Sequence, residues 1–280
     1  MVRLTEWMTR RDRVLVMGVL NLTPDSFYAA SRLASPELAV ERALRMVDDG
    51  ADLLDVGGES SRPGSRPISA QQEIERVVPV IEAVRRRSDV LLSVDTTKAA
   101  VAAEALSAGA SVVNDISALR FDAGMARLIA DREAFVVLMH MQGIPQTMQD
   151  APRYEDVVAE VKRFLAQRIA AAQAAGIPKG RILVDPGIGF GKRLEDNLEL
   201  LRHLRTLHEL GAPILVGLSR KSFLGALLDL PAPERLEGTI AAGAVAVVNG
   251  ADVLRVHDVK EGVRTARVAG ALRDNEIRNR

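Results

Sequence analysis

From residue 14 onward, the chain alternates short aliphatic runs with longer amphipathic segments, and it does so eight times. A run of four to seven apolar, often β-branched residues is typical of a buried strand, and a longer amphipathic segment is typical of a helix that covers it. The alternation therefore predicts βα units and a parallel sheet. The expected strands are Val14–Leu20, Asp52–Gly57, Val90–Val94, Ser111–Ile116, Phe135–His140, Arg181–Asp185, Pro213–Gly217 and Asp252–His257. The expected helices include Pro36–Asp48, Gln71–Arg87, Lys98–Ala108, Tyr154–Ala175, Glu195–Glu209 and Glu234–Asn249.

Eight consecutive βα units in a chain of 280 residues predict an α/β fold that closes as a single (β/α)8 TIM barrel. An open doubly wound sheet is the alternative. No linker or shift in composition divides the chain, so we expect one domain over residues 1–280, with the barrel at about 14–275. Residues 1–13 form a short N-terminal extension that either plugs the bottom of the barrel or makes a small hairpin.

The composition narrows the class of protein. Lys and Arg together number 37, as do Asp and Glu, so nothing indicates a surface for nucleic acid or anionic membranes. The absence of cysteine excludes disulfides, thiolate nucleophiles and cysteine-ligated metals. The first residues are not typical of a signal peptide, and no apolar run approaches the length of a membrane span. We therefore expect a cytoplasmic protein.

A polar residue lies at or just beyond the carboxyl end of every expected strand. In a barrel these ends converge on one mouth, where barrel enzymes hold their active sites. Turns also favour Asp, Asn and Gly, which alone explains roughly half of the set. The eight residues are Asn21, Asp55, Asp95, Asn114, His140, Asp185, Ser219 and His257.

The stretch from Ile182 to Lys192 is the most informative of these strand ends, because Asp185 is followed at once by a loop rich in glycine. It is not a P-loop, since the glycine spacing is wrong and Arg193 stands where a Ser or Thr would hold magnesium. It is also one residue too short for a dinucleotide fingerprint. We interpret Asp185 as a ligand contact, although a simple Asp-Pro-Gly turn explains the stretch if it is taken alone.

Asp95, Asn114 and Asp185 together would offer acceptors and one donor on the floor of the barrel. Such a set fits a flat heterocycle with an amino-pyrimidinone edge. A buried carboxylate is costly unless it is paired, and Lys221 is the expected cation.

Three further segments indicate anion binding. The loop 57–66 combines glycines, serines and Arg62, which suits phosphate oxygens, although a solvated loop would look the same. Arg255 and His257 are two apart on a strand and therefore share one face. Ser222 opens an expected helix whose first N–H groups could hold a carboxylate, although an ordinary Ser-capped helix is equally consistent.

Asn21 could offer its carbonyl oxygen to a hard cation. No zinc-type histidine spacing and no nucleophile motif is present.

Taken together and in order, these segments resemble the dihydropteroate synthase family, the pterin-binding enzymes of folate biosynthesis. The resemblance extends from about Val14 to Val263. The motifs that carry it are Asn21-Leu22-Thr23-Pro24-Asp25-Ser26-Phe27, residues 55–64, Ser93-Val94-Asp95, Asn114-Asp115-Ile116, residues 138–143, residues 185–192, Ser219-Arg220-Lys221 and Arg255-Val256-His257-Asp258.

The resemblance implies condensation of 6-hydroxymethyl-7,8-dihydropterin diphosphate with p-aminobenzoate, giving 7,8-dihydropteroate and pyrophosphate by a largely dissociative displacement. It also implies Mg²⁺ as cofactor, small-molecule substrates and a homodimer that uses the later barrel helices. The residues that it assigns are as follows: Asp95, Asn114, Met139, Asp185, Phe190 and Lys221 for the pterin; Asn21, Arg62, Arg255 and His257 for the diphosphate, with Asn21 on the metal; and Phe27, Ser61, Pro63, Ser219 and Ser222 for p-aminobenzoate. Arg62, Asp95, Lys221, Arg255 and His257 would be the catalytic residues.

The sequence departs from the family pattern after Phe27. The family has Ser-Asp-Gly-Gly there, whereas this chain has Tyr28-Ala29-Ala30-Ser31, so the loop aspartate is replaced by Ala29. Two alternatives follow. One is a methyltetrahydrofolate:corrinoid methyltransferase, which would share the polar floor but need no diphosphate site. The other is a non-catalytic pterin-binding homologue, supported by the altered loop.

Overall fold

The computed structural model of the protein describes residues 4–23, 36–61 and 64–273, and its central feature is a closed parallel barrel. Eight parallel strands follow the order β6-β5-β4-β3-β2-β1-β8-β7. A bridge between Val184 and Ile214 joins the two ends of this sheet, so the barrel closes. The predicted TIM barrel is therefore confirmed. The strands are β1 Leu15–Asn21, β2 Leu53–Gly57, β3 Leu91–Asp95, β4 Val112–Asp115, β5 Phe135–Met139, β6 Ile182–Asp185, β7 Leu215–Gly217 and β8 Val253–Val256.

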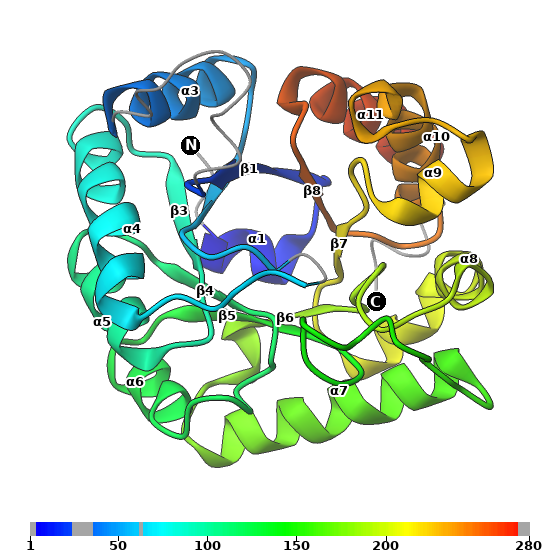
Figure 1. Ribbon diagram of the computed structural model, residues 1–280, viewed down its shortest axis with the longest axis horizontal. Helices are drawn as coiled ribbons and strands as arrows, with labels where there is room; N and C mark the ends of the chain where they lie inside the picture. The colour runs from blue at the N-terminus through cyan, green and yellow to red at the C-terminus, as the bar shows by residue number, and fades with distance from the viewer. Residues whose placement is uncertain (1–3, 24–35, 62–63, 274–280) are drawn as a thin grey trace.

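Helices surround the barrel as an outer ring (Figure 1). They are α3 Pro36–Asp48, α4 Ala70–Arg85, α5 Ala99–Ser107, α6 Met125–Asp131, α7 Val157–Ala174, α8 Leu194–Arg202, α9 Ser222–Leu228, α10 Leu236–Val248 and α11 Val259–Leu272, with 3₁₀ turns at η1 Lys179–Arg181, η2 Leu204–Leu210 and η3 Ala232–Glu234. In the part of the chain that the structure describes, no helix has the length and apolar character that crossing a membrane requires.

One expected helix, Glu195–Glu209, is wrong in its extent, because α8 ends at Arg202 and the 3₁₀ turn η2 follows. The cause lies in the spacing of the leucines. Leu204 and Leu207 are buried and three residues apart, and a helix with three residues per turn places both on the same side.

The N-terminal extension is a helix, α1 Leu4–Arg10, which lies across the amino-terminal end of the barrel (Figure 1). It buries Leu4, Trp7 and Met8 against the inward-facing apolar residues of the strands, among them Leu15 and Leu53. The Trp7 indole also donates a hydrogen bond to the Arg13 carbonyl at 2.8 Å. The predicted plug is confirmed, and the hairpin alternative is wrong.

The inward-facing side of the strands changes from apolar to polar along the barrel axis. On β2, Leu53 faces the lower interior cluster, while Leu54 packs outward against the helices. Because side chains alternate along a strand, Asp55 faces inward again, two residues closer to the mouth. Helix α1 closes the amino-terminal end of the barrel, and the inward-facing polar side chains lie at the carboxyl end. We therefore expect the ligand site at the carboxyl end.

Candidate active site

Strand register places three predicted positions, Asn21, Asp95 and Asn114, side by side at the mouth. Asn21 of β1 pairs with Gly57 of β2, Gly57 with Asp95 of β3, and Asp95 with Asn114 of β4. Gly57 has no side chain, and a Cβ built there would lie 3.6 Å from Asn21 Oδ1 and 3.5 Å from the Asp95 Cβ. Asn21 and Asp95 therefore face each other across a glycine.

Arg255 of β8 joins two acids inside the barrel. Its Nε donates to Asp55 Oδ2 at 2.6 Å, and its Nη2 donates to Asp95 Oδ2 at 2.7 Å. Asn114 Nδ2 also donates to Asp55 Oδ2, at 2.8 Å. Although burial lowers the pKa of Arg255, the two carboxylates outweigh that effect and raise it. Arg255 is thus a fixed cation, held in place from two neighbouring strands.

Burial shifts the pKa of Asp95 upward. Removal from water raises the pKa of Asp95 to about 7, with the Arg255 charge opposing this rise and Asp55 adding to it. A carboxyl group in this state can be ionised by any additional positive charge that approaches it. Asp95 is therefore sensitive to the charge of a bound ligand.

Several buried polar atoms on the barrel floor have no hydrogen-bond partner among the described residues. They include Asp55 Oδ1, Ser93 Oγ and Asn114 Oδ1. Asp55 and Ser93 are paired in register on β2 and β3. Buried polar groups are nearly always satisfied, by protein, water or ligand. Their presence together at one level of the barrel marks the floor as a place that accepts a polar molecule.

The opposite wall contains Asp185 and Lys221. Asp185 is buried at the end of β6, and its Oδ1 accepts a hydrogen bond from the Gly187 amide at 2.6 Å. Burial raises its pKa, and the nearby charge of Lys221 opposes that rise. Lys221 donates to the Ile188 carbonyl and lies 4.7 Å from the centre of the Phe190 ring. Among the described residues Lys221 forms no ion pair with a carboxylate, and its charge acts on Asp185 without direct contact.

An apolar wall adjoins these charges. Met139, Ile116, Met141 and Met148 form a separate buried cluster, and Phe190 packs against it. Met139 is also in register with Asp185. A flat ring could therefore lie between this wall and the acids, with its polar edge toward Asp185.

Side-chain hydrogen bonds and an ion pair join the loop after β7 to the loop after β8. His257 Nδ1 lies 3.0 Å from Ser219 Oγ, and the Arg220 guanidinium forms two hydrogen bonds with Asp258, at 2.9 and 2.6 Å. Burial, and then the charge of Arg255, lower the pKa of His257 to about 4. His257 is therefore neutral in the ligand-free protein. Its Nδ1 is occupied by Ser219, so Nε2 is the ring nitrogen left for a ligand.

Other predicted residues lie at the edge of the site or outside the described residues. Ser222 is exposed and begins α9, and the N-cap residue Lys221 makes no side-chain capping hydrogen bond in the described part of the chain. Ser61 is partly exposed in the loop after β2. Phe27, Arg62 and Pro63 lie outside the described residues.

Asp55 and Ser93 are the residues of the site whose importance the sequence did not reveal. Asp55 was noted at a strand end but received no role, and its side chain is completely buried. The signal was the strand alternation itself, because Leu53, Asp55 and Gly57 must share the inward face. An inward-facing Arg255 requires a buried acid as its partner. That partner is Asp55, which lies 200 positions away in the chain.

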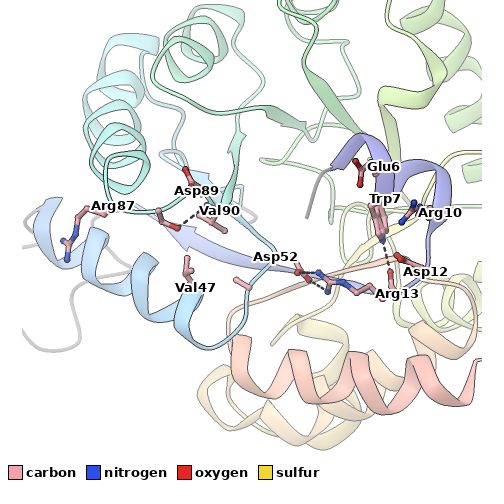
Figure 2. A pocket seen from close by; sticks show the side chains of 12 residues that line it. Glu6, Trp7, Arg10, Asp12, Arg13, Val47, Asp52, Arg87, Asp89 and Val90 are labelled. Carbon is pink, nitrogen blue, oxygen red and sulfur yellow. Dashed lines mark hydrogen bonds and ion pairs between the residues drawn. The ribbon is translucent and has the colours of Figure 1, made fainter. Parts of the chain in front are cut away.

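A cleft of about 680 Å³ lies at the opposite end of the barrel, beside α1 (Figure 2). Its charged residues include Arg13 and Asp52, which form a two-pronged ion pair with one another at 3.0 and 2.5 Å. Among the described residues, none of those that line this cleft has a buried polar atom without a hydrogen-bond partner. We therefore assign the site to the carboxyl end of the barrel.

The chain is similar to known proteins over nearly its whole length. The profile of the family described as pterin binding enzyme matches residues 17–257. Dihydropteroate synthase of Escherichia coli (strain K12) is 47% identical over 256 residues, which cover 91% of this chain and 90% of that protein.

Two solved structures extend the similarity to three dimensions. The Yersinia pestis dihydropteroate synthase in a sulfonamide drug complex superimposes with a TM-score of 0.90 at 46% identity, covering 94% of this chain and 95% of that one. The Xanthomonas albilineans dihydropteroate synthase with 4-aminobenzoic acid gives a TM-score of 0.88 at 48% identity, with 94% of each chain covered. The chain therefore belongs to the pterin-binding enzyme family, as a member of its dihydropteroate synthase group.

Proposed function

We propose that this protein is a transferase that condenses 6-hydroxymethyl-7,8-dihydropterin diphosphate with p-aminobenzoate, giving 7,8-dihydropteroate and pyrophosphate. The observation that carries this proposal is the polar floor itself: Asp95, Asn114 and Asp185 line one barrel mouth beside two partly buried cations, Arg255 and Lys221. The solved relative with 4-aminobenzoic acid supports the choice of the second substrate.

The pterin would lie between the floor and the apolar wall. Its amino-pyrimidinone edge presents adjacent donors and acceptors, which Asp185 and Asn114 can match. Asn114 Oδ1 has no partner among the described residues and is an acceptor ready for a ring N–H. Lys221 and Phe190, which contact each other, would cover the ring from the side of the β6 loop.

The diphosphate would lie near Asn21, Arg255 and His257, with Arg62 added from the loop after β2. The residues present fit Mg²⁺, because Asn21 offers a carbonyl oxygen at the mouth, and this ion is commonly held by few protein ligands together with phosphates and water. No group of three or more acids and histidines that could hold a metal occurs among the described residues, so the substrate would supply most of the ligands. When bound, Mg²⁺ would neutralise charge on the departing pyrophosphate.

The reaction needs one bond broken and one formed. The bond between the pterin methylene and the diphosphate oxygen breaks, with its electron pair leaving on pyrophosphate. The arylamine nitrogen then bonds to the methylene and loses a proton. Asp95 and Asp185 favour the positive charge that develops on the pterin, and Arg255 and His257 stabilise the leaving group. The aniline lone pair is free at neutral pH, so a strong general base is not required.

The p-aminobenzoate carboxylate would lie at Ser222, at the start of α9, where the N-cap Lys221 makes no side-chain capping hydrogen bond and the helix dipole favours an anion. Ser219, Ser61, Pro63 and Phe27 would complete this half of the site.

The expected result of an assay with both substrates is turnover that requires Mg²⁺ and stops on chelation. Turnover that is unaffected by chelation would count against the assignment of Asn21 to a metal.

We also propose that the protein is a homodimer that uses α10 and α11. Exposed apolar residues gather on these helices, and Val245, Val268 and Leu272 are 52%, 64% and 72% exposed. Exposed apolar patches on soluble proteins commonly mark interfaces. The cytoplasmic location expected from the composition stays a prediction.

Charge placed on this patch should separate the subunits. Light scattering coupled to gel filtration is expected to give about twice the chain mass of 30.3 kDa for the wild type and a single chain for the variant Val245→Asp/Val268→Asp. Leu38→Asp, at an apolar residue of α3 that is 42% exposed, is the matched control and should remain a dimer. A double variant that keeps the wild-type mass would place the interface elsewhere.

A further inference from the structure

Lys192 closes the glycine-rich loop after β6, but it does not face a ligand. It is 3% exposed, and no acid lies within salt-bridge distance of it among the described residues. Its Nζ lies 2.9 Å from the Gly187 carbonyl oxygen, 3.0 Å from the Phe190 carbonyl oxygen and 2.9 Å from His140 Nδ1. An ammonium group has three N–H donors, and these three acceptors satisfy them.

His140 is suited to be the third acceptor. It follows β5 and is buried, and the Phe164 ring packs edge-on against it at 4.8 Å. Burial, then the charges of Lys192 and Arg120, lower the pKa of His140 to about 2, so the imidazole is neutral and one nitrogen can accept. Burial also lowers the pKa of Lys192 to about 7, with Asp185 opposing the change. Three acceptors around Nζ favour the ammonium form.

The glycines let the loop come this close to the end of β5. Gly187 and Gly191 have φ values of 68° and 60°, in the left-handed region that other residues avoid. A Cβ at Gly187 would lie 1.9 Å from the His140 carbonyl oxygen, and one at Gly191 would lie 2.6 Å from the Gln142 carbonyl oxygen. The loop therefore packs its backbone directly against residues 140–142, and Lys192 satisfies the carbonyls that this conformation turns inward.

The same loop presents the pterin contacts. Gly187 donates its amide to Asp185, Phe190 donates its amide to the Gly187 carbonyl at 3.0 Å, and the Ile188 carbonyl accepts from Lys221. The two carbonyls that Lys192 holds, at residues 187 and 190, therefore flank the carbonyl that holds Lys221.

We propose that Lys192 is a positioning residue for the pterin site: from behind the loop, it fixes the Phe190 ring and the Ile188 carbonyl, and through them Lys221. This inference rests on the proposed function for the identity of the ligand. Although Lys192 follows a glycine-rich loop, it does not bind phosphate in this role, because its ammonium group faces the protein.

Lys192→Met tests the proposal, since it keeps an unbranched side chain and removes all three donors. The KM for the dihydropterin diphosphate and its Kd by calorimetry are expected to rise about tenfold or more, because the loop carbonyls lose their partner. The KM for p-aminobenzoate and kcat at saturating pterin should stay within about twofold of wild type. Lys192→Gln, which keeps two N–H donors, should lie between wild type and Lys192→Met.

Arg193→Met is the matched control, because it removes the adjacent cation, which is exposed and pairs with Asp196. It should leave the pterin KM unchanged. A wild-type pterin KM and Kd in Lys192→Met, with only the unfolding free energy lowered, would overturn the proposal and leave Lys192 a purely structural residue. Should Lys192→Met not fold, Lys192→Gln carries the same comparison. If the wild type binds pterin without turnover, the proposed function fails, whereas the Kd comparison still decides the role of Lys192.

Discussion

Replacing Arg255 with Ala is expected to lower kcat/KM for dihydropteroate formation by roughly two to three orders of magnitude. The change removes a cation from the leaving-group side and leaves Asp55 and Asp95 without their shared partner. Removing one preorganised donor that stabilises developing negative charge lowers the rate by about 10²–10³-fold, which sets the expected range. Steady-state kinetics and calorimetry with the dihydropterin diphosphate measure the effect.

The loss should depend on the diphosphate. The plain hydroxymethyl pterin, which lacks phosphate oxygens, is expected to lose much less affinity for the Arg255→Ala variant. Arg13→Ala, at the ion pair with Asp52 at the other end of the barrel (Figure 2), is the control and should bind both ligands as wild type does. An equal loss for both pterins would mean that Arg255 only supports the floor and does not contact the diphosphate.

Asp185→Asn is expected to weaken binding of the pterin by roughly 10- to 100-fold, with or without its diphosphate. The amide oxygen can still accept from Gly187, but one acceptor and the negative charge near Lys221 are lost. Hydrogen bonds to charged groups contribute about 1.5–3 kcal/mol, which corresponds to this range of affinity. Calorimetry with the hydroxymethyl pterin measures it directly.

Asp156→Asn provides the comparison. That carboxylate also accepts a backbone N–H, from Ala159 at 3.0 Å, but at the start of α7 on the outside of the barrel. Both variants make the same chemical change, and only Asp185→Asn should alter pterin affinity. Unchanged affinity in Asp185→Asn would show that the pyrimidine edge is held by other residues.

Strand positions could be predicted from the sequence because a strand buried on both faces appears as an unbroken aliphatic run. Each expected strand overlaps an observed one, with shifts of one or two residues at the ends, as for Pro213–Gly217 against β7. The polar strand ends could be predicted too, because barrel topology brings the carboxyl ends together whatever the details of packing. Asp95, Asn114 and Asp185 all lie at the mouth as expected.

The pairing of charges could not be predicted, because it depends on which strands face each other across the barrel. Arg255 was expected to face an anion, and the structure shows that it also binds Asp55 and Asp95 from strands early in the chain. Lys192 followed a glycine-rich loop and could have faced a ligand or the protein. Only the backbone conformation, with Gly187 against the His140 carbonyl, decides that it faces inward.

The measurement that tests the central claim most directly is a turnover assay of the wild-type protein with the dihydropterin diphosphate, p-aminobenzoate and Mg²⁺, in which pyrophosphate and dihydropteroate are followed together. We predict that both form in equal amounts, which would also show that Tyr28-Ala29-Ala30-Ser31 in the first loop is compatible with catalysis. Pterin binding without either product would contradict the account and indicate a non-catalytic pterin-binding homologue.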